Sequence, residues 1–170
     1  VKLLKMKRMA PWMIFLLLMV GGIYGSSILA QKSNASRPGE AVSVMKVEHI
    51  EEGERFEGYN SNPPTSGPHA GPAPWGMNYT EHPDENLVHN LEHGGIWISH
   101  KNLTETDVAT LESIARGYKT TVVVSPREQN DANIAVASWG RLLKLDILNE
   151  AAIKEFIQLN TNKSPEPMAR

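Results

Sequence analysis

The sequence predicts an α+β domain, in which about three helices pack on a small mixed sheet, preceded by an N-terminal hydrophobic helix. Apolar residues recur at helical spacing around residues 85–93, 104–117 and 149–157, and short runs typical of strands lie between these segments. A proline-rich loop over residues 51–84 separates the first strand from the first of the three helices. A chain of this length and pattern is expected to form a single core.

The first thirty residues are typical of a targeting segment and stand apart from the fold. Four basic side chains open the chain, and residues 11–23 are then apolar except for a glycine pair. Small residues just before residue 31 resemble a cleavage site, whereas the length of segment 11–30 is close to the ~20 residues that span a bilayer. Residues 1–30 are therefore predicted to be either a cleaved signal peptide or a transmembrane helix that anchors the protein.

The remaining chain is predicted to form one extracytoplasmic domain. Residues 31–40 are polar, contain a proline and a glycine, and are typical of a linker. Residues 41–162 hold the periodic segments and form the domain, and residues 163–170 form a frayed tail. We expect this domain outside the cytoplasm, anchored to the cell membrane through the N-terminal segment, or secreted if the signal is cleaved.

Composition restricts the chemistry of the exported part. Four of the 17 basic residues and none of the 19 acidic ones precede residue 31, so the exported part has a net charge of about −6. This charge argues against a nucleic-acid partner. The chain has no cysteine, which excludes disulfides, thiolate zinc sites and iron-sulfur clusters. Any metal must be held by histidine, methionine, carboxylate or backbone oxygen.

The first half of the domain is predicted to contain one strand and one long functional loop. Residues 42–50 are assigned to a first strand, although the alternation of apolar residues slips at Met45. The following loop to residue 84 has almost no periodic signal, and loops of this length in compact domains are usually functional or disordered. Tyr59, Trp75 and Tyr79 favour a functional loop, because a disordered segment usually lacks such aromatic anchors.

The second half is predicted to alternate between strands and helices. Residues 96–100 form a strand with alternating faces, and Thr104 caps a helix that ends at Gly117. The β-branched run 120–124 is typical of a central strand, and residues 134–139 form another strand. Asn149 caps the last helix, whose core-facing residues are Ile153, Phe156 and Ile157.

The candidate site begins with two histidines spaced four residues apart. His89 and His93 project from one face of a helix, so both rings can reach one ion. Leu87 and Leu91 point the opposite way and can dock on the core, while Gly94 can take the left-handed conformation that ends the helix. The spacing predicts an outward-facing pair of metal ligands.

A useful site needs a third ligand, and the loop offers His69. Three prolines precede it closely, which reduces the entropy lost when the ring is presented to an ion. Met77 and His82 are further candidates, and a thioether ligand would shift the preference from zinc toward copper. His49 and His100 are weaker candidates, because they lie in strands.

Three functional hypotheses follow from these residues. The first is a transition-metal-binding protein that holds a copper or zinc ion, with copper favoured, through His69, His89 and His93. The second is a protein-interaction module in which the histidines only help to fold the loop that docks a protein partner. The third is a zinc-dependent hydrolase, because residues 89–93 fit the pattern His-x-x-Glu-His, in which Glu92 would activate metal-bound water. Outside this third hypothesis Glu92 is expected to orient a ligand histidine or to bind the loop.

Three segments carry a family resemblance: Asn60–His69, Leu87–Gly95 and Ala137–Arg141. They resemble the signatures of the prokaryotic family known as domain of unknown function 3105, over about residues 51–159. The resemblance implies an exported, often membrane-anchored single domain in which His69, His89, Glu92 and His93 occupy the motif positions. It implies no reaction.

Overall fold

The structure is a computed structural model that describes residues 11–35 and 37–168, and the chain divides into two compact units, residues 1–37 and 38–170. The first unit contains a single described element, helix α1 (Pro11–Ala35). Among the described residues, no helix is both long and apolar enough to span a membrane. The predicted targeting segment lies partly outside these residues, at positions 1–10, and its assignment as a transmembrane anchor is not confirmed.

The second unit is built on a mixed sheet of six strands in the order β1-β8-β7-β5-β6-β4. The strands are β1 (Glu40–Ala41), β4 (Gly76–Met77), β5 (Ile96–His100), β6 (Val122–Pro126), β7 (Ile134–Ser138) and β8 (Arg141–Leu145). Strand β6 runs parallel to β5 and β4, and the remaining pairs are antiparallel. The predicted α+β fold is therefore confirmed.

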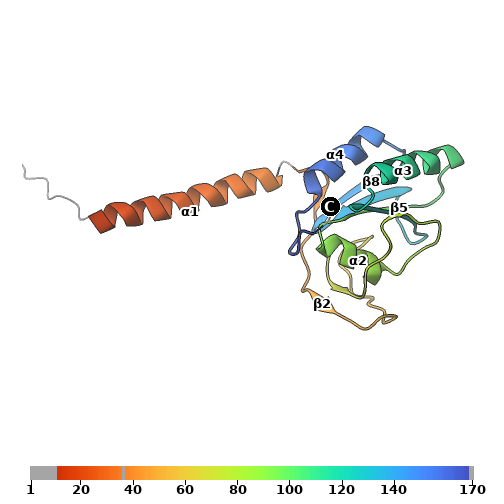
Figure 1. Cartoon of the computed structure of the whole chain (residues 1–170), viewed down its shortest axis with the longest axis horizontal. Helices are drawn as coiled ribbons and strands as arrows, with labels where there is room; N and C mark the ends of the chain where they lie inside the picture. Colours follow the sequence, from red (N-terminus) through yellow and green to blue (C-terminus); the bar gives the residue numbers. More distant parts are fainter. Residues whose placement is uncertain (1–10, 36, 169–170) are drawn as a thin grey trace, which may run out of the picture. The chain divides into compact units, whose positions relative to one another are not determined.

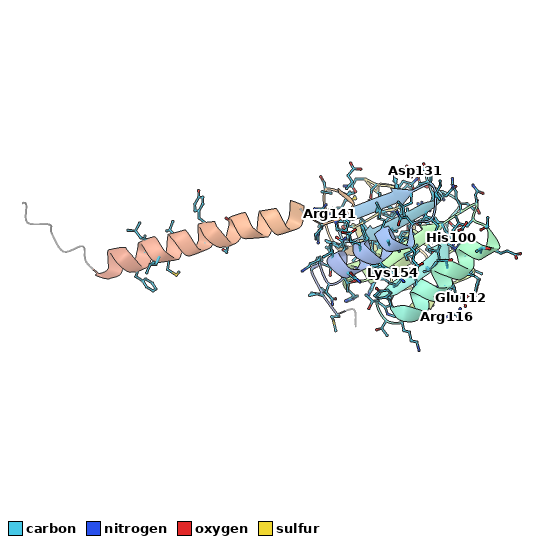
Figure 2. The ribbon with its side chains drawn as sticks, turned by 90° about the horizontal axis from the view of Figure 1, so that it is seen from above. His100, Glu112, Arg116, Asp131, Arg141 and Lys154 are labelled. Carbon is cyan, nitrogen blue, oxygen red and sulfur yellow. The ribbon has the colours of Figure 1, made fainter. Side chains whose placement is uncertain are left out.

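Helices cover both faces of this sheet. Helices α3 (Glu105–Gly117) and α4 (Glu150–Asn160) lie on one face, and helix α2 (Asp84–Glu92) lies on the other (Figure 1). The outer surfaces of α3 and α4 carry ion pairs between residues four apart, Glu112 with Arg116 and Glu150 with Lys154. Glu112, Arg116 and Lys154 are labelled in Figure 2.

The alternation of side chains along β5 separates two hydrophobic clusters. Ile96 and Ile98 pack with residues of α3 and α4, whereas Trp97 packs with Leu87 and Leu91 of α2. All five side chains are fully buried. The predicted faces of strand 96–100, and the predicted apolar face of the histidine helix, are thus confirmed.

A second sheet consists of only two short parallel strands, β2 (Glu48–His49) and β3 (Pro68–His69). The prediction of one continuous strand over residues 42–50 is wrong. Its alternation slips at Met45, and there the backbone amide donates to the hydroxyl of Ser66 instead of a neighbouring strand. The segment consequently joins two sheets, through β1 just before it and β2 near its end.

Strand β8 was not predicted from the sequence. Its charged residues Arg141 and Lys144 interrupt the apolar pattern that identifies a strand, yet it pairs along its full length with β7. The helix caps were predicted correctly. The side chain of Thr104 accepts a hydrogen bond from the amide of Asp107 at 3.2 Å, and the side chain of Asn149 accepts one from Ala152 at 3.0 Å.

The chain after α4 returns to the C-terminal end of α2. The amide of Asn162 donates to the carbonyl of Gly94 at 2.9 Å, that of Glu166 to Glu92 at 3.2 Å, and that of Met168 to His93 at 3.0 Å. Residues 162–168 are therefore held against α2, where the sequence suggested a frayed end.

Candidate metal centre

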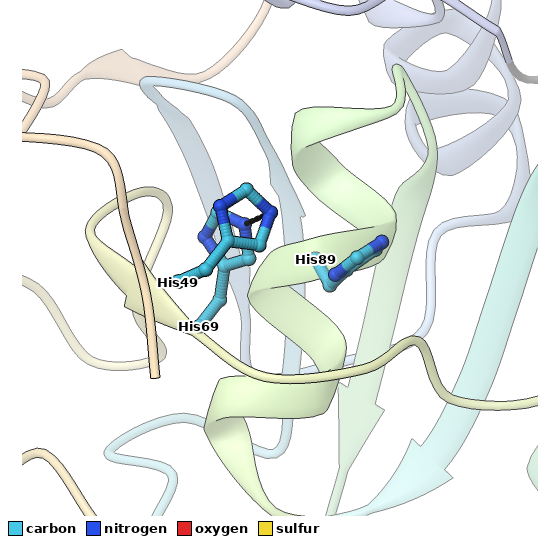
Figure 3. A group of neighbouring side chains, drawn as sticks. All are labelled: His49, His69 and His89. Carbon is cyan, nitrogen blue, oxygen red and sulfur yellow. Dashed lines mark hydrogen bonds between the residues drawn. The ribbon is translucent and has the colours of Figure 1, made fainter. Parts of the chain in front are cut away.

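The second sheet and helix α2 bring three histidines and one glutamate together. In the parallel pairing of β2 with β3, His49 lies directly opposite His69. His89 and Glu92 both belong to α2. Figure 3 shows the rings of His49 and His69 beside α2, from which His89 projects. The centroids of the His49 and His69 rings are 4.5 Å apart, and those of His69 and His89 are 5.2 Å apart.

His69 is fully buried, and its hydrogen bonding defines which ring nitrogen is free. Its Nδ1 atom lies 2.9 Å from the carbonyl oxygen of Gly67. Since a carbonyl can only accept, Nδ1 carries the hydrogen, and in the neutral ring Nε2 holds a lone pair. That Nε2 atom lies 3.3 Å from Nε2 of His49 and 2.9 Å from Oε2 of Glu92. A backbone contact that fixes one nitrogen and leaves the other free is the usual state of a metal-binding histidine.

His89 is held in the same way from the other side. Its Nδ1 atom lies 2.5 Å from the carbonyl oxygen of Ala70, so its Nε2 atom is also left with a lone pair. Burial lowers the pKa of His89 below its usual value of 6.5, a shift that the contact with Ala70 opposes. The ring is therefore neutral, the form that binds metals, at neutral pH. One nitrogen from each of His49, His69 and His89 lies within 4.8 Å of the others.

Glu92 places a buried carboxylate beside His69 and His49. The residue is 1% exposed, and among the described residues no donor forms a hydrogen bond with its Oε2 atom. The contact of 2.9 Å with Nε2 of His69 is close enough for an ion pair but does not have hydrogen-bond geometry. A buried carboxylate requires a cation or donors. Glu92 is also the last residue of α2, where the helix dipole favours positive charge.

The spacing of these atoms matches the ligand shell of a small transition-metal ion. Two ligands that each lie about 2.0–2.1 Å from one tetrahedral ion are roughly 3.4 Å apart. The distances among His49 Nε2, His69 Nε2 and Glu92 Oε2 are 3.3, 2.9 and 3.9 Å. Three ligands are thus already close to the required separation, and one ring nitrogen of His89 lies within 4.8 Å of those of His49 and His69.

Two of the predicted ligands, His69 and His89, are brought together. His93 follows α2 as its C-cap residue, and its ring centroid lies 4.7 Å from that of His89. Its Nδ1 atom, however, lies 3.7 Å from Oε2 of Glu166, and His93 belongs to a separate group with Glu92 and Glu166.

Met77 and His82 are placed away from the three histidines. Met77 packs against the hydrophobic cluster on the face of the sheet that α3 and α4 cover, opposite α2. Nε2 of His82 lies 3.1 Å from Oδ1 of Asn78. His82 also lines a different hollow, together with Arg55 and Arg127.

From the sequence, His49 was predicted only as a weaker candidate for a metal ligand. Its position in a strand gave no reason to place it beside His69, because the pairing joins two residues that are 20 positions apart in the chain. The available signal was that a histidine occurs in a segment with a broken apolar alternation, which implies an irregular backbone near the loop.

A hollow of about 420 Å³ lies beside the group and is lined by Trp75, His89, His93 and Met168, among others. It lies against two imidazoles and is otherwise largely apolar. An ion bound to His89 would therefore lie next to a space that a small molecule can enter.

Comparison with known proteins gives a family but no activity. The family described as protein of unknown function (DUF3105) matches residues 49–170, which is well over half of the chain. No curated protein matches the chain, and no solved structure does.

Proposed function

The chain belongs to the DUF3105 family of proteins of unknown function, and we propose that it binds a transition-metal ion through His49, His69, His89 and Glu92. The single observation that carries the proposal is the contact between Nε2 of His69 and Oε2 of Glu92. Both atoms are buried, each has a lone pair when the imidazole is neutral and the carboxylate ionised, and they are 2.9 Å apart. Two such atoms repel unless a cation lies between them.

The ligand set supports copper ahead of zinc. Three imidazoles and one carboxylate suit both Cu(II) and Zn(II), and Cu(II) binds the same nitrogen and oxygen ligands more tightly in the Irving–Williams order. The sequence favoured copper partly because Met77 offered a thioether. Since Met77 packs on the opposite face of the sheet, the preference now depends on the imidazole ligands alone.

We place this site outside the cytoplasm. The support is the sequence of residues 1–30, in which basic residues, an apolar stretch and small residues follow in the order of an export signal. The segment would either be removed or tether the domain to the membrane. A site made without cysteine also suits an oxidising compartment, because its ligands are not consumed by disulfide formation.

We do not extend the proposal to hydrolysis. In the His-x-x-Glu-His mechanism the glutamate must be free to take a proton from metal-bound water. Oε2 of Glu92 instead lies 2.9 Å from Nε2 of His69, a separation that suits two ligands of one ion. It is more suitable as a ligand than as a base.

The proposal is tested by metal binding to the full chain purified without a histidine tag. We expect wild-type protein to bind Cu(II) and Zn(II) tightly in calorimetry, and His49→Ala to lower the affinity at least about 100-fold. His49 suits this test because its side chain is exposed and its removal leaves the core intact. His82→Ala is the matched control and should bind like wild type, since its ring contacts Asn78 instead. Equal affinity in His49→Ala and wild type would overturn the proposed ligand set.

A further inference from the structure

We propose that the chain has a second metal site, formed by His93, Glu166 and Glu92, so that the carboxylate of Glu92 joins two ions. This inference rests on the proposed function, because Glu92 is also a ligand of the first ion. One ligand atom from each of the three residues lies within 4.8 Å of the others. The second group shares no histidine with the first.

The ligand pair at the centre of this site is His93 with Glu166. Nδ1 of His93 and Oε2 of Glu166 are 3.7 Å apart, which is too long for a hydrogen bond. The distance is close to the roughly 3.4 Å between two ligands of one tetrahedral ion. The side chain of Glu166 is 56% exposed, so it can move the remaining few tenths of an ångström without disturbing the core.

The backbone holds Glu166 in place although it lies near the end of the chain. The amides of Asn162, Glu166 and Met168 donate to the carbonyls of Gly94, Glu92 and His93 respectively. These three hydrogen bonds dock the segment after α4 onto the C-terminal end of α2. The ordering entropy of the backbone is therefore already lost before an ion binds, which favours binding.

Glu92 contributes a buried carboxylate that lies near both groups. It is 1% exposed, and its Oε2 atom accepts no hydrogen bond from the described residues. With Glu166 beside it, two carboxylates approach the C-terminal end of α2, where the helix dipole adds further negative potential. A divalent ion bound at His93 offsets this negative potential. An ion bound only at the three histidines is not coordinated by Glu166 and leaves its charge without a metal ligand contact.

The second site is also accessible to solvent ions. His93 is partly exposed and lines the hollow that also contains Trp75, His89 and Met168. An ion can therefore reach His93 without any opening of the fold.

The test counts zinc ions bound per chain, with Zn²⁺ alone as the probe. The full chain is saturated with Zn²⁺, separated from free metal and measured by elemental analysis, while calorimetry records the number of binding steps. We expect two ions per wild-type chain in two steps. Glu166→Gln and His93→Ala should each bind one ion, with the affinity of the tighter step changed less than about tenfold. Glu155→Gln, which removes an exposed carboxylate on α4, is the matched control and should bind two.

Each outcome is decisive. Saturation at one ion in wild type, together with the same stoichiometry in Glu166→Gln, would overturn the second site and leave the first intact. Saturation at two ions in Glu166→Gln and in His93→Ala would place the second ion elsewhere and also overturn the proposal. A wild-type chain that binds no zinc would instead overturn the proposed function, and this result is distinct from saturation at one ion.

Discussion

His69 and Glu92 face each other across 2.9 Å, with Nε2 of the imidazole toward Oε2 of the carboxylate, and both side chains are almost completely buried. Because Nδ1 of His69 is committed to the carbonyl of Gly67, the buried carboxylate beside Nε2 needs a compensating positive charge. A proton on Nε2 or a metal ion could supply it. The two possibilities predict different behaviour of the same variants.

Replacing Glu92 by glutamine separates a metal from a proton. If the carboxylate serves a metal, Glu92→Gln should lower metal affinity at least about tenfold and leave the metal-free protein as stable as wild type, because a buried charge is removed. If instead it forms a buried ion pair with protonated His69, the variant should lose about 3–5 kcal/mol of stability without metal.

Urea unfolding in the presence of a chelator measures this difference. Glu81→Gln, on the loop before α2, is the control for loss of an exposed carboxylate. We expect both variants to unfold near the wild-type midpoint. A large shift for Glu92→Gln alone would favour the ion pair over the metal.

Metal affinity should depend on pH in a direction that follows from His89. Burial lowers the pKa of His89 below 6.5, so protons compete with the ion only at a lower pH than they would for a free imidazole. Affinity for Zn(II) should thus fall as the solution becomes acidic, and the competition of protons for His89 should set in below pH 6.5. Calorimetric titrations at several pH values test this expectation, and constant affinity down to pH 5 would contradict histidine ligation.

Stability of the metal-free protein should also depend on pH through His100 on β5 (Figure 2). Burial lowers its pKa below 6.5, and among the described residues its Nε2 atom has no hydrogen-bond partner. The unfolded chain then takes up a proton near pH 6.5, at which the folded ring stays neutral. The stability that neutral His100 contributes to the folded protein is fully present above pH 6.5. It is lost as the pH falls from there toward the pKa of His100 in the folded chain.

The variant His100→Gln removes this titration. Urea unfolding at pH 7.5 and pH 5.5, with a chelator present, should show a smaller loss of stability in the variant than in wild type. His89 titrates in both proteins, so its effect cancels in the comparison. Identical losses would mean that His100 titrates alike in the folded and unfolded chains.

The ion pair between Arg127 and Asp84 should matter for both fold and site. Nε and Nη2 of Arg127 donate to the two carboxylate oxygens of Asp84 at 2.8 and 2.7 Å, and Arg127 is 4% exposed. Asp84 is the first residue of α2, the helix that carries His89 and Glu92. Asp84→Ala leaves a buried guanidinium without its main partner, and we expect a loss of about 3–5 kcal/mol.

The comparison is with an exposed pair of the same kind. Lys144 and Asp131 are 2.6 Å apart but about half exposed, so Asp131→Ala should cost less than about 1 kcal/mol. Chemical denaturation of the two variants measures both values. Similar losses would show that burial does not determine the strength of these pairs.

Much of the fold could be predicted because periodic apolar segments report packing locally. The helices containing His89, Leu111 and Phe156, and strand β5, each bury a face that is visible in the spacing of their own residues. Strand β8 escaped prediction because Arg141 and Lys144 interrupt its pattern. The two-residue strands are too short to leave any period in the sequence.

The site was only partly predictable for a related reason. His69 and His89 were identified because a helix spacing and a proline-rich approach are local signals. His49 depends on a parallel register between distant segments, and Glu166 depends on how the end of the chain docks on α2. Neither relationship is encoded by the neighbours of the residue in the sequence.

The parallel pairing of β2 with β3 also makes the stability of the folded domain depend on the bound ion. His49, His69, His89 and Glu92 come from three separate segments, so an unfolded chain offers no comparable chelate. An ion that binds only the folded chain raises its stability by about 2.7 kcal/mol at a free concentration 100 times the dissociation constant. For a domain of marginal stability, the fraction of intact molecules would then follow the local metal supply, so that metal starvation alone would expose the chain to proteolysis.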